Sequence, residues 1–229
     1  MACALILAAG RGERLRPLTD TLPKPLLPAG GRALIEWQVE KLARAGFRDI
    51  VVNHSHLGVM IERALGDGAR FGARIRYSPE PTALETAGGI ANALPLLGDS
   101  PLVVVSGDIH TDFDYASLHQ RAQTIAANPR ATAAHWVLVD NPPWHAGGDD
   151  MGIERGRVVR GGPRLTYANI GVFHPALFDG MAPGTRMRLF PWAYRLADEG
   201  RVSGERYGGP WDNVGTAEQL AALDRRLAK

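Results

Sequence analysis

The sequence predicts an α/β protein with a mainly parallel central sheet and helices on both of its faces. The first observation is the run LVVVS at 102–106, a short continuous apolar stretch typical of a buried parallel strand. The second is the segment 33–45, where apolar residues recur at helical spacing until Gly46 ends them. The third is the alternation of such strand and helix patterns along the chain, which favours parallel strands joined by helices.

Each element is expected from its own pattern. Strands are predicted at 3–8, 49–53, 74–78, 102–106 and 132–139. Helices are predicted at 33–45, 57–65, 86–97 and around 114–127. The C-terminal third changes to a small mixed β section, with a hairpin around 154–159, a longer strand at 165–173 and closing helices at 188–199 and 216–227. The stretch 141–150, rich in proline and glycine, is expected to be a mobile surface loop.

Composition and charge narrow the class of protein. The chain has 229 residues, 45% apolar and 22% charged, which suits one globular domain over 1–229. A net charge of +2 does not indicate a nucleic-acid partner, and no apolar run is long enough to span a membrane. Basic residues follow the first apolar run, which is the wrong order for a secretion signal. Because Cys3 is the one cysteine, we expect no internal disulfide and a cytoplasmic protein.

The stretch 7–28 carries the strongest functional signal. It follows the first predicted strand, and ligands of open α/β sheets bind at the carboxyl ends of strands. Gly10 and Gly12 allow close backbone approach, and successive N–H groups there can bind phosphate oxygens. Arg14 and Lys24 add positive charge, and four prolines stiffen the loop, which reduces the entropy lost on binding. A polyphosphate site is therefore favoured over a solvated basic loop. A dinucleotide fingerprint is excluded by Leu15, and a P-loop motif is absent.

Asp108 is the second candidate, at the carboxyl end of the strand 102–106 and facing the same crevice. From its position alone it fits a metal ligand and a turn residue equally well. A triphosphate site needs Mg²⁺, which takes one or two carboxylates and keeps several waters. Gly88 and Gly89 stand early in a predicted helix, where glycine is costly unless something approaches the backbone.

Three segments together resemble the opening of the sugar-1-phosphate nucleotidyltransferases: LAAGRGERL at 7–15, PLT at 17–19 and PKPL at 23–26. The resemblance implies a Rossmann-like, GT-A-type fold with a nucleotide-binding half at about 1–112 and a sugar-phosphate-binding half at about 113–229. It implies that Arg14 contacts the β- and γ-phosphates, that Lys24 lies near the α-phosphate, and that both act in catalysis with Asp108. The nucleotide-binding residues it implies are Leu7, Ala8, Ala9, Gly10, Gly12, Arg14, Lys24, Glu80, Thr86 and Gly88.

The same resemblance extends to the metal and sugar sites. WDNVGT at 211–216 is similar to the family's W-x-D-x-G-T, whose aspartate is the second metal ligand. Here Asn213 takes that position, and Asp212 would point to the other face of a strand. The implied Mg²⁺ ligands are therefore Asp108 and Asn213. The implied sugar-phosphate residues are Glu85, Asn169, Gly171 and Arg188, with Arg186 close by.

Within the family, segments 77–80, 84–86, 138–142 and 202–205 resemble enzymes that transfer UMP to N-acetylmuramate 1-phosphate in peptidoglycan recycling. The resemblance implies UTP and a sugar 1-phosphate as small-molecule substrates, UDP-N-acetylmuramate as product and a monomer. A mannose-1-phosphate guanylyltransferase or another hexose-1-phosphate nucleotidyltransferase is the alternative. A GT-A glycosyltransferase using Asp112-Phe113-Asp114 as its D-x-D motif, and a non-catalytic nucleotide-binding protein, are further alternatives.

Overall fold

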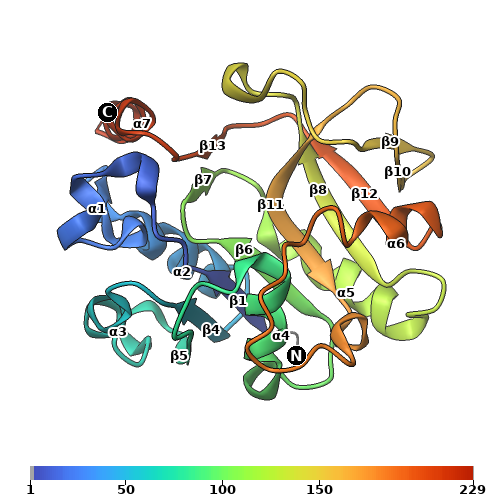
Figure 1. Cartoon of the computed structure of the whole chain (residues 1–229), viewed down its shortest axis with the longest axis horizontal. Helices are drawn as coiled ribbons and strands as arrows, with labels where there is room; N and C mark the ends of the chain where they lie inside the picture. Colours follow the sequence, from blue (N-terminus) through green and yellow to red (C-terminus); the bar gives the residue numbers. More distant parts are fainter. Residues whose placement is uncertain (1–2, 229) are drawn as a thin grey trace.

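The computed structural model describes residues 3–228 and has a large central sheet with helices on both faces (Figure 1). Within those residues the sheet has nine strands. Their order across the sheet is β5 (Arg74–Pro79), β4 (Asp49–His54), β1 (Ala4–Leu7), β6 (Leu102–Ser106), β11 (Thr166–Phe173), β8 (Ala134–Val139), β12 (Val202–Tyr207), β10 (Arg157–Val159) and β9 (Gly152–Glu154). β5, β4, β1 and β6 are parallel, whereas β11 runs antiparallel between β6 and β8. The predicted α/β class with a mainly parallel sheet is confirmed.

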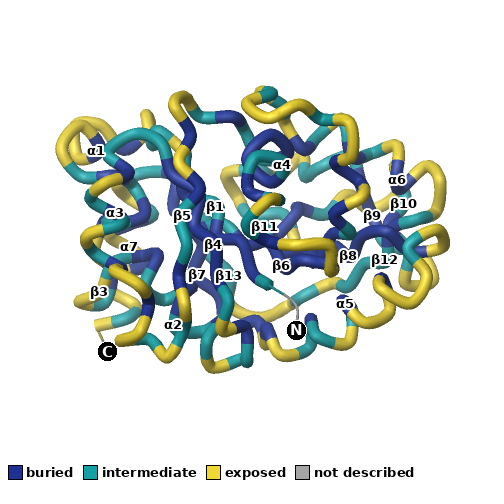
Figure 2. Tube along the Cα trace, turned by 90° about the horizontal axis from the view of Figure 1, so that it is seen from below, coloured by how far each residue is buried: buried dark blue, intermediate teal, exposed yellow. Residues whose placement is uncertain are grey.

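The helices form two layers because successive strand residues point to opposite faces of the sheet. On one face, Ile6 packs in a core with α2 (Leu34–Arg44), α3 (Gly58–Leu65) and α5 (Leu118–Ala127). On the other face, Leu5 packs in a core with α4 (Glu85–Leu97) and α6 (Tyr194–Asp198). Figure 2 shows the strands buried at the centre and the connecting loops exposed around them.

Smaller elements complete the fold around one edge of the sheet. Two short antiparallel pairs are β2 (Pro28–Ala29) with β3 (Arg32–Ala33), and β7 (Ile109–Thr111) with β13 (Trp211–Asn213). The remaining helices are α1 (Leu18–Thr21), α7 (Ala217–Leu227) and the single 3-10 turns η1 (Glu13–Leu15), η2 (Lys24–Leu26), η3 (Ala69–Phe71), η4 (Tyr115–Ser117), η5 (Pro143–His145) and η6 (Pro175–Phe178). The last helix, α7, packs in a small core with Leu27 and Ala29 from the first part of the chain.

Strand direction gathers the polar strand ends along this edge. β8 is antiparallel to β11 and β12 is parallel to β8, so β1, β4, β5, β6, β8 and β12 all point the same way. Ile6 of β1 pairs with Val52 of β4 and with Val105 of β6. The segments that follow these strands therefore emerge side by side, where ligands bind in open α/β sheets.

Most predicted elements agree with the structure to within two residues, but some features differ. The predicted helix 188–199 is reduced to Tyr194–Asp198, because Pro191 has no N–H to continue a longer helix. β12, with its polar sequence and Gly204, lies where no strand is expected from the sequence. The stretch 141–150 is a loop, as expected, in which the Asn141 side-chain N–H donates to the carbonyl of Arg164 at 3.0 Å, and its mobility stays a prediction. Among residues 3–228, no helix has the length and apolar character needed to cross a membrane.

Candidate active site

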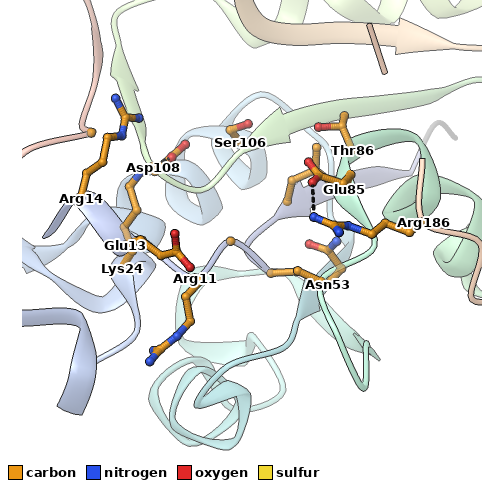
Figure 3. Close-up of a pocket in the computed structure, with 16 residues that line it drawn as sticks. Arg11, Glu13, Arg14, Lys24, Asn53, Glu85, Thr86, Ser106, Asp108 and Arg186 are labelled. Carbon is orange, nitrogen blue, oxygen red and sulfur yellow. Dashed lines mark hydrogen bonds and ion pairs between the residues drawn. The ribbon is translucent and has the colours of Figure 1, made fainter. Parts of the chain in front are cut away.

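A cavity of about 650 Å³ opens at the carboxyl edge of the sheet (Figure 3). Nine of the residues predicted from the sequence line it: Leu7, Ala9, Gly10, Gly12, Arg14, Lys24, Glu85, Thr86 and Asp108. They come from the loop after β1, the start of α4 and the end of β6, which are far apart in the sequence. The structure thus brings most of the residues expected to bind the nucleotide together with Asp108, one of the two expected metal ligands, whereas Asn213 is outside the cavity lining.

The loop after β1 folds tightly around Gly12. Its φ of 68° lies in the left-handed region that favours glycine, and a Cβ there would lie 3.0 Å from both Lys24 Cβ and Thr19 Cγ2. The Thr19 hydroxyl donates a hydrogen bond to the Gly12 carbonyl at 2.9 Å. Nothing lies within 4 Å of the Cβ position of Gly10, which faces the open cavity. The loop therefore packs against the base of the Lys24 side chain and leaves Gly10 accessible to a ligand.

Lys24 and Asp108 form an ion pair between the loop after β1 and the end of β6. Their side chains are 11% and 25% exposed, so the pair is largely shielded from water. The N–H of Gly107 donates to the carbonyl of Leu7 at 2.8 Å, which fastens this end of β6 to β1. One ammonium group and one carboxylate are thereby held next to each other at the cavity wall. Such a pair can bind a phosphate oxygen through the ammonium and a cation through the carboxylate.

The oxygen donors around Asp108 fit Mg²⁺ held together with a phosphate substrate. The N–H of Val214 donates to the Asp108 carbonyl at 3.0 Å, and Asn213 pairs with Ile109, so Asn213 lies beside Asp108. Asp212 instead forms an ion pair with Arg226 of α7. No cluster of three or more His, Cys, Asp or Glu side chains suited to a metal occurs within residues 3–228. A single carboxylate suits Mg²⁺, which keeps waters and takes substrate phosphates as its other ligands.

The structure shows internal hydrogen bonds for Glu80, whose contact with a nucleobase stays a prediction. Glu80 is 4% exposed and lies behind the cavity wall. One of its carboxylate oxygens accepts from Asn53 Nδ2 at 2.6 Å and the other from the N–H of Leu84 at 2.8 Å. Asn53 Oδ1 in turn accepts from the N–H of Ala8 at 2.7 Å. Burial raises the pKa of Glu80, and the two hydrogen bonds it accepts oppose that rise. Glu80 thus braces the loop after β1 against the start of α4.

The glycines at the start of α4 also have a packing explanation. A Cβ on Gly88 would lie 2.2 Å from the carbonyl oxygen of Thr185, and the Gly88 N–H donates to the carbonyl of Met187 at 3.0 Å. A Cβ on Gly89 would lie 2.6 Å from Asn53 Nδ2. What approaches these glycines is the protein's own chain, so the prediction that Gly88 binds the nucleotide is not supported.

The residues expected at the sugar phosphate divide into two groups. Glu85, at a positive φ of 64°, accepts from Arg186 at 2.8 Å, and its carboxylate is 3.8 Å from Arg188 Nε (Figure 3). Gly171 lies inside the sheet, where a Cβ would be 2.9 Å from the Tyr167 hydroxyl, so packing explains this glycine, and its contact with the sugar stays a prediction. Asn169 lies at a bulge of β11 with φ 58° and is outside the cavity lining.

Some cavity residues are missed by the sequence analysis: Arg11, Glu13, Asn53, Ala83, Ser106 and Gly215. Asn53 and Ser106 each stand at the carboxyl end of a correctly predicted strand, and a polar residue there is the signal that could have found them. Gly215 belongs to the motif at 211–216. The motif alone does not indicate that this glycine lines the cavity.

The tripeptide Asp112-Phe113-Asp114 has no metal-binding geometry. Asp112 forms an ion pair with Lys41 at 3.3 Å, and the Asp114 side chain accepts from the N–H of Ala116 at 3.0 Å. Asp114 therefore caps the turn before α5, as short polar side chains commonly do. The D-x-D interpretation, and with it the glycosyltransferase alternative, loses its structural basis.

We expect Glu80→Gln to destabilise the protein although it changes almost no volume. Glu80 accepts two hydrogen bonds, whereas a glutamine amide has one acceptor and one donor group. Flipping the side-chain amide of Asn53 would instead leave the N–H of Ala8 without its acceptor. An unsatisfied buried donor costs about 1–3 kcal/mol, which should appear as a lower free energy of unfolding in urea. Glu62→Gln, on a carboxylate that is 41% exposed, is the matched control. Equal stability of the two variants would contradict this account of Glu80.

Comparison with known proteins agrees with this site. The Nucleotidyl transferase family model matches residues 3–143. The N-acetylmuramate alpha-1-phosphate uridylyltransferase of Neisseria meningitidis serogroup B is 48% identical over 221 residues, covering 95% of this chain and 94% of that protein. A protein of the same name from Caulobacter vibrioides is 32% identical, covering 99% and 97%. A solved Bacillus anthracis structure, provisionally described as a glucose-1-phosphate thymidylyltransferase, shares the fold with a TM-score of 0.82, at 22% identity, covering 100% of this chain and 96% of that one. The chain therefore belongs to the nucleotidyl transferase family and is an enzyme of the sugar-1-phosphate nucleotidyltransferase type.

Proposed function

We propose that the protein transfers UMP from UTP to N-acetylmuramate 1-phosphate, giving UDP-N-acetylmuramate and pyrophosphate. The observation that carries the proposal is the cavity in which Arg14, Lys24 and Asp108 converge on one wall. The identity of 48% to an N-acetylmuramate alpha-1-phosphate uridylyltransferase over 95% of the chain supports the choice of substrates. A role in peptidoglycan recycling is part of the same proposal. The cytoplasmic location and the monomeric state stay predictions.

In the proposed reaction, an oxygen of the sugar phosphate attacks the α-phosphorus of UTP. A bond forms between that oxygen and the phosphorus, the bond to the oxygen bridging the α- and β-phosphates breaks, and its electron pair leaves with pyrophosphate. The attacking phosphate is already an anion, so no general base is needed. The enzyme must bring two anions together, and catalysis then depends on positioning and charge neutralisation.

The proposed roles of the two cations come from the family resemblance. Lys24, next to Asp108, would neutralise charge near the α-phosphate, and Arg14, which packs against Gly215, would contact the β- and γ-phosphates. Gly10 leaves room for phosphate oxygens to reach the backbone. Asp108, with Asn213 beside it, would hold Mg²⁺. When bound, Mg²⁺ supplies charge compensation and alignment of the triphosphate.

The acceptor would bind near Glu85 and Arg186. Arg186 is 71% exposed, so its ion pair with Glu85 contributes little to stability and can open. N-acetylmuramate carries a lactyl carboxylate in addition to its phosphate, and Arg186 and Arg188 offer two cations for these anions. We propose that one of these two arginines releases the Glu85 carboxylate and binds an anionic group of the acceptor.

A substrate matrix tests the proposed function. The four nucleoside triphosphates are each combined with the 1-phosphates of N-acetylmuramate, N-acetylglucosamine, mannose and glucose, with Mg²⁺ present, and released pyrophosphate is measured. We expect the highest kcat/KM for UTP with N-acetylmuramate 1-phosphate. Preference for GTP with mannose 1-phosphate would instead support the guanylyltransferase alternative. Binding of UTP without pyrophosphate release from any pair would support a non-catalytic nucleotide-binding protein.

A further inference from the structure

Gly215, in the turn before α7, lines the cavity together with Arg14, although the two residues come from opposite ends of the chain. The side chain of Gln219 in α7 turns back to the preceding turn. Its Oε1 accepts from the N–H of Gly215 at 2.6 Å and from the N–H of Thr216 at 2.9 Å. Thr216 Oγ1 accepts from the N–H of Gln219 at 3.3 Å, which closes a capping box. Gln219 therefore fixes the backbone of Gly215 directly.

The side chain of Arg14 packs against Gly215. Both residues line the cavity. A Cβ on Gly215 would lie 2.8 Å from Arg14 Nη2 and 3.1 Å from its Cζ, so the guanidinium is packed against bare backbone. Any side chain at this position, or a shift of the turn, would push the guanidinium away from where it now lies. The position of the Arg14 charge thus depends on the turn that Gln219 holds.

The rest of α7 also packs against this part of the chain. Leu220 and Leu223 pack in a core with Leu15, the neighbour of Arg14, and with Leu27 near the end of the loop. Asp224 Oδ1 also accepts from the N–H of Gly30 at 2.8 Å. The helix is therefore attached to the loop after β1 next to Arg14 and again beyond Lys24, and Gln219 holds the turn that packs against Arg14.

We infer that Gln219 is a positioning residue that sets the orientation of Arg14 toward the β- and γ-phosphates, acting through the backbone of Gly215. The inference rests on the proposed function in one respect, the binding of UTP with its terminal phosphates at Arg14. Without the Gln219 oxygen, the two N–H groups of the turn lose their acceptor and the turn no longer has a fixed position under the guanidinium. Glutamate at this position keeps the acceptor and adds a favourable negative charge near a helix N-terminus.

The test compares binding of UTP with binding of UMP, which lacks the terminal phosphates, by isothermal titration calorimetry. We expect Gln219→Ala to weaken UTP binding about tenfold, the effect of disturbing one hydrogen bond to a charged group, and to leave UMP binding unchanged. Gln219→Glu should bind UTP like the wild type. Arg225→Ala, on an exposed residue of the same helix, is the matched control and should also bind normally.

A double-mutant cycle shows whether the effect passes through Arg14. In an Arg14→Ala background, Gln219→Ala should cause no further loss of UTP affinity. Additive losses, equal weakening of UTP and UMP, or failure of Gln219→Glu to restore binding would each overturn the inference. Should Gln219→Ala not fold, Gly215→Ala keeps the Gln219 contacts, moves the guanidinium directly and is expected to show the same selective loss of UTP. The binding assay needs no acceptor, so a wild type that binds UTP but releases no pyrophosphate would count against the proposed function and not against this inference.

Discussion

Replacing Lys24 with alanine is expected to lower kcat by about 10²–10³, the range found when one preorganised donor to a developing oxyanion is removed. Lys24 is the cation at the cavity wall next to Asp108, and its side chain is only 11% exposed. Charge placed where water is largely excluded acts more strongly on a transferring phosphoryl group than charge on an exposed side chain. The loss should therefore fall mainly on kcat and less on the KM for UTP.

The fold should survive Lys24→Ala, because neither Gly12 nor the turn around η2 depends on the Lys24 ammonium group. Thermal unfolding followed by circular dichroism checks this point. Lys41→Ala is a matched control, since Lys41 also forms an ion pair with an aspartate, Asp112, but outside the cavity. It should keep normal turnover. If Lys24→Ala turned over at near the wild-type rate, the central claim of the proposed mechanism would be wrong.

The sequence predicts most of the sheet because most of its strands are apolar runs or alternate between apolar and polar residues. Strand 102–106 is found with its true bounds, and with it the place of Asp108 at the carboxyl edge. β12 is not predicted because its residues are mostly polar. Its glycine, Gly204, is explained only by the folded structure, in which a Cβ at this position would lie 2.7 Å from Val158 Cγ2. Local patterns thus predict elements that are apolar by themselves and miss those that depend on a distant partner.

The glycines show the same limit at the site. Gly12, Gly88 and Gly171 all suggest close approach of something to the backbone, and the sequence does not say of what. At Gly12 it is the side chain of Lys24, at Gly88 the carbonyl of Thr185, and at Gly171 the Tyr167 hydroxyl. All three approaching groups belong to the protein, and Gly12 alone of the three also lines the cavity. The family resemblance identifies the loop after β1, whereas the group that approaches each glycine is known only from the structure.

Glu80 shows why a residue's role does not follow from its place in a motif. Its position after β5 is at the ligand-binding edge, as expected. Its carboxylate, however, is the acceptor that two buried donors require, from Asn53 and Leu84. A buried network of this kind favours one arrangement of the loops around the cavity, because each member needs its partner. The choice between a ligand contact and a bracing contact is made by the surrounding donors, which the sequence does not reveal.

Asp108→Asn is expected to reduce kcat/KM by on the order of 10²-fold and to raise the Mg²⁺ concentration needed for half-maximal activity, because several kcal/mol of charge stabilisation pass through a catalytic metal ion. The change keeps an oxygen donor and the shape of the side chain but removes the carboxylate that forms the ion pair with Lys24. It leaves the backbone contact from the Val214 N–H to the Asp108 carbonyl intact, so the turn at 213–216 should stay in place.

Two measurements separate a metal role of Asp108 from a purely electrostatic role toward Lys24. Electron paramagnetic resonance of Mn²⁺ in the presence of UTP reports cation binding without turnover, and Asp108→Asn should weaken it. Asp112→Asn changes an aspartate that is also paired with a lysine, but outside the cavity, and should bind Mn²⁺ normally. Loss of Mn²⁺ binding in Asp112→Asn with normal binding in Asp108→Asn would restore the D-x-D site and the glycosyltransferase chemistry that goes with it. Selective loss of Mn²⁺ binding in Asp108→Asn would instead place the metal ion at the end of β6, next to the Lys24 ammonium group.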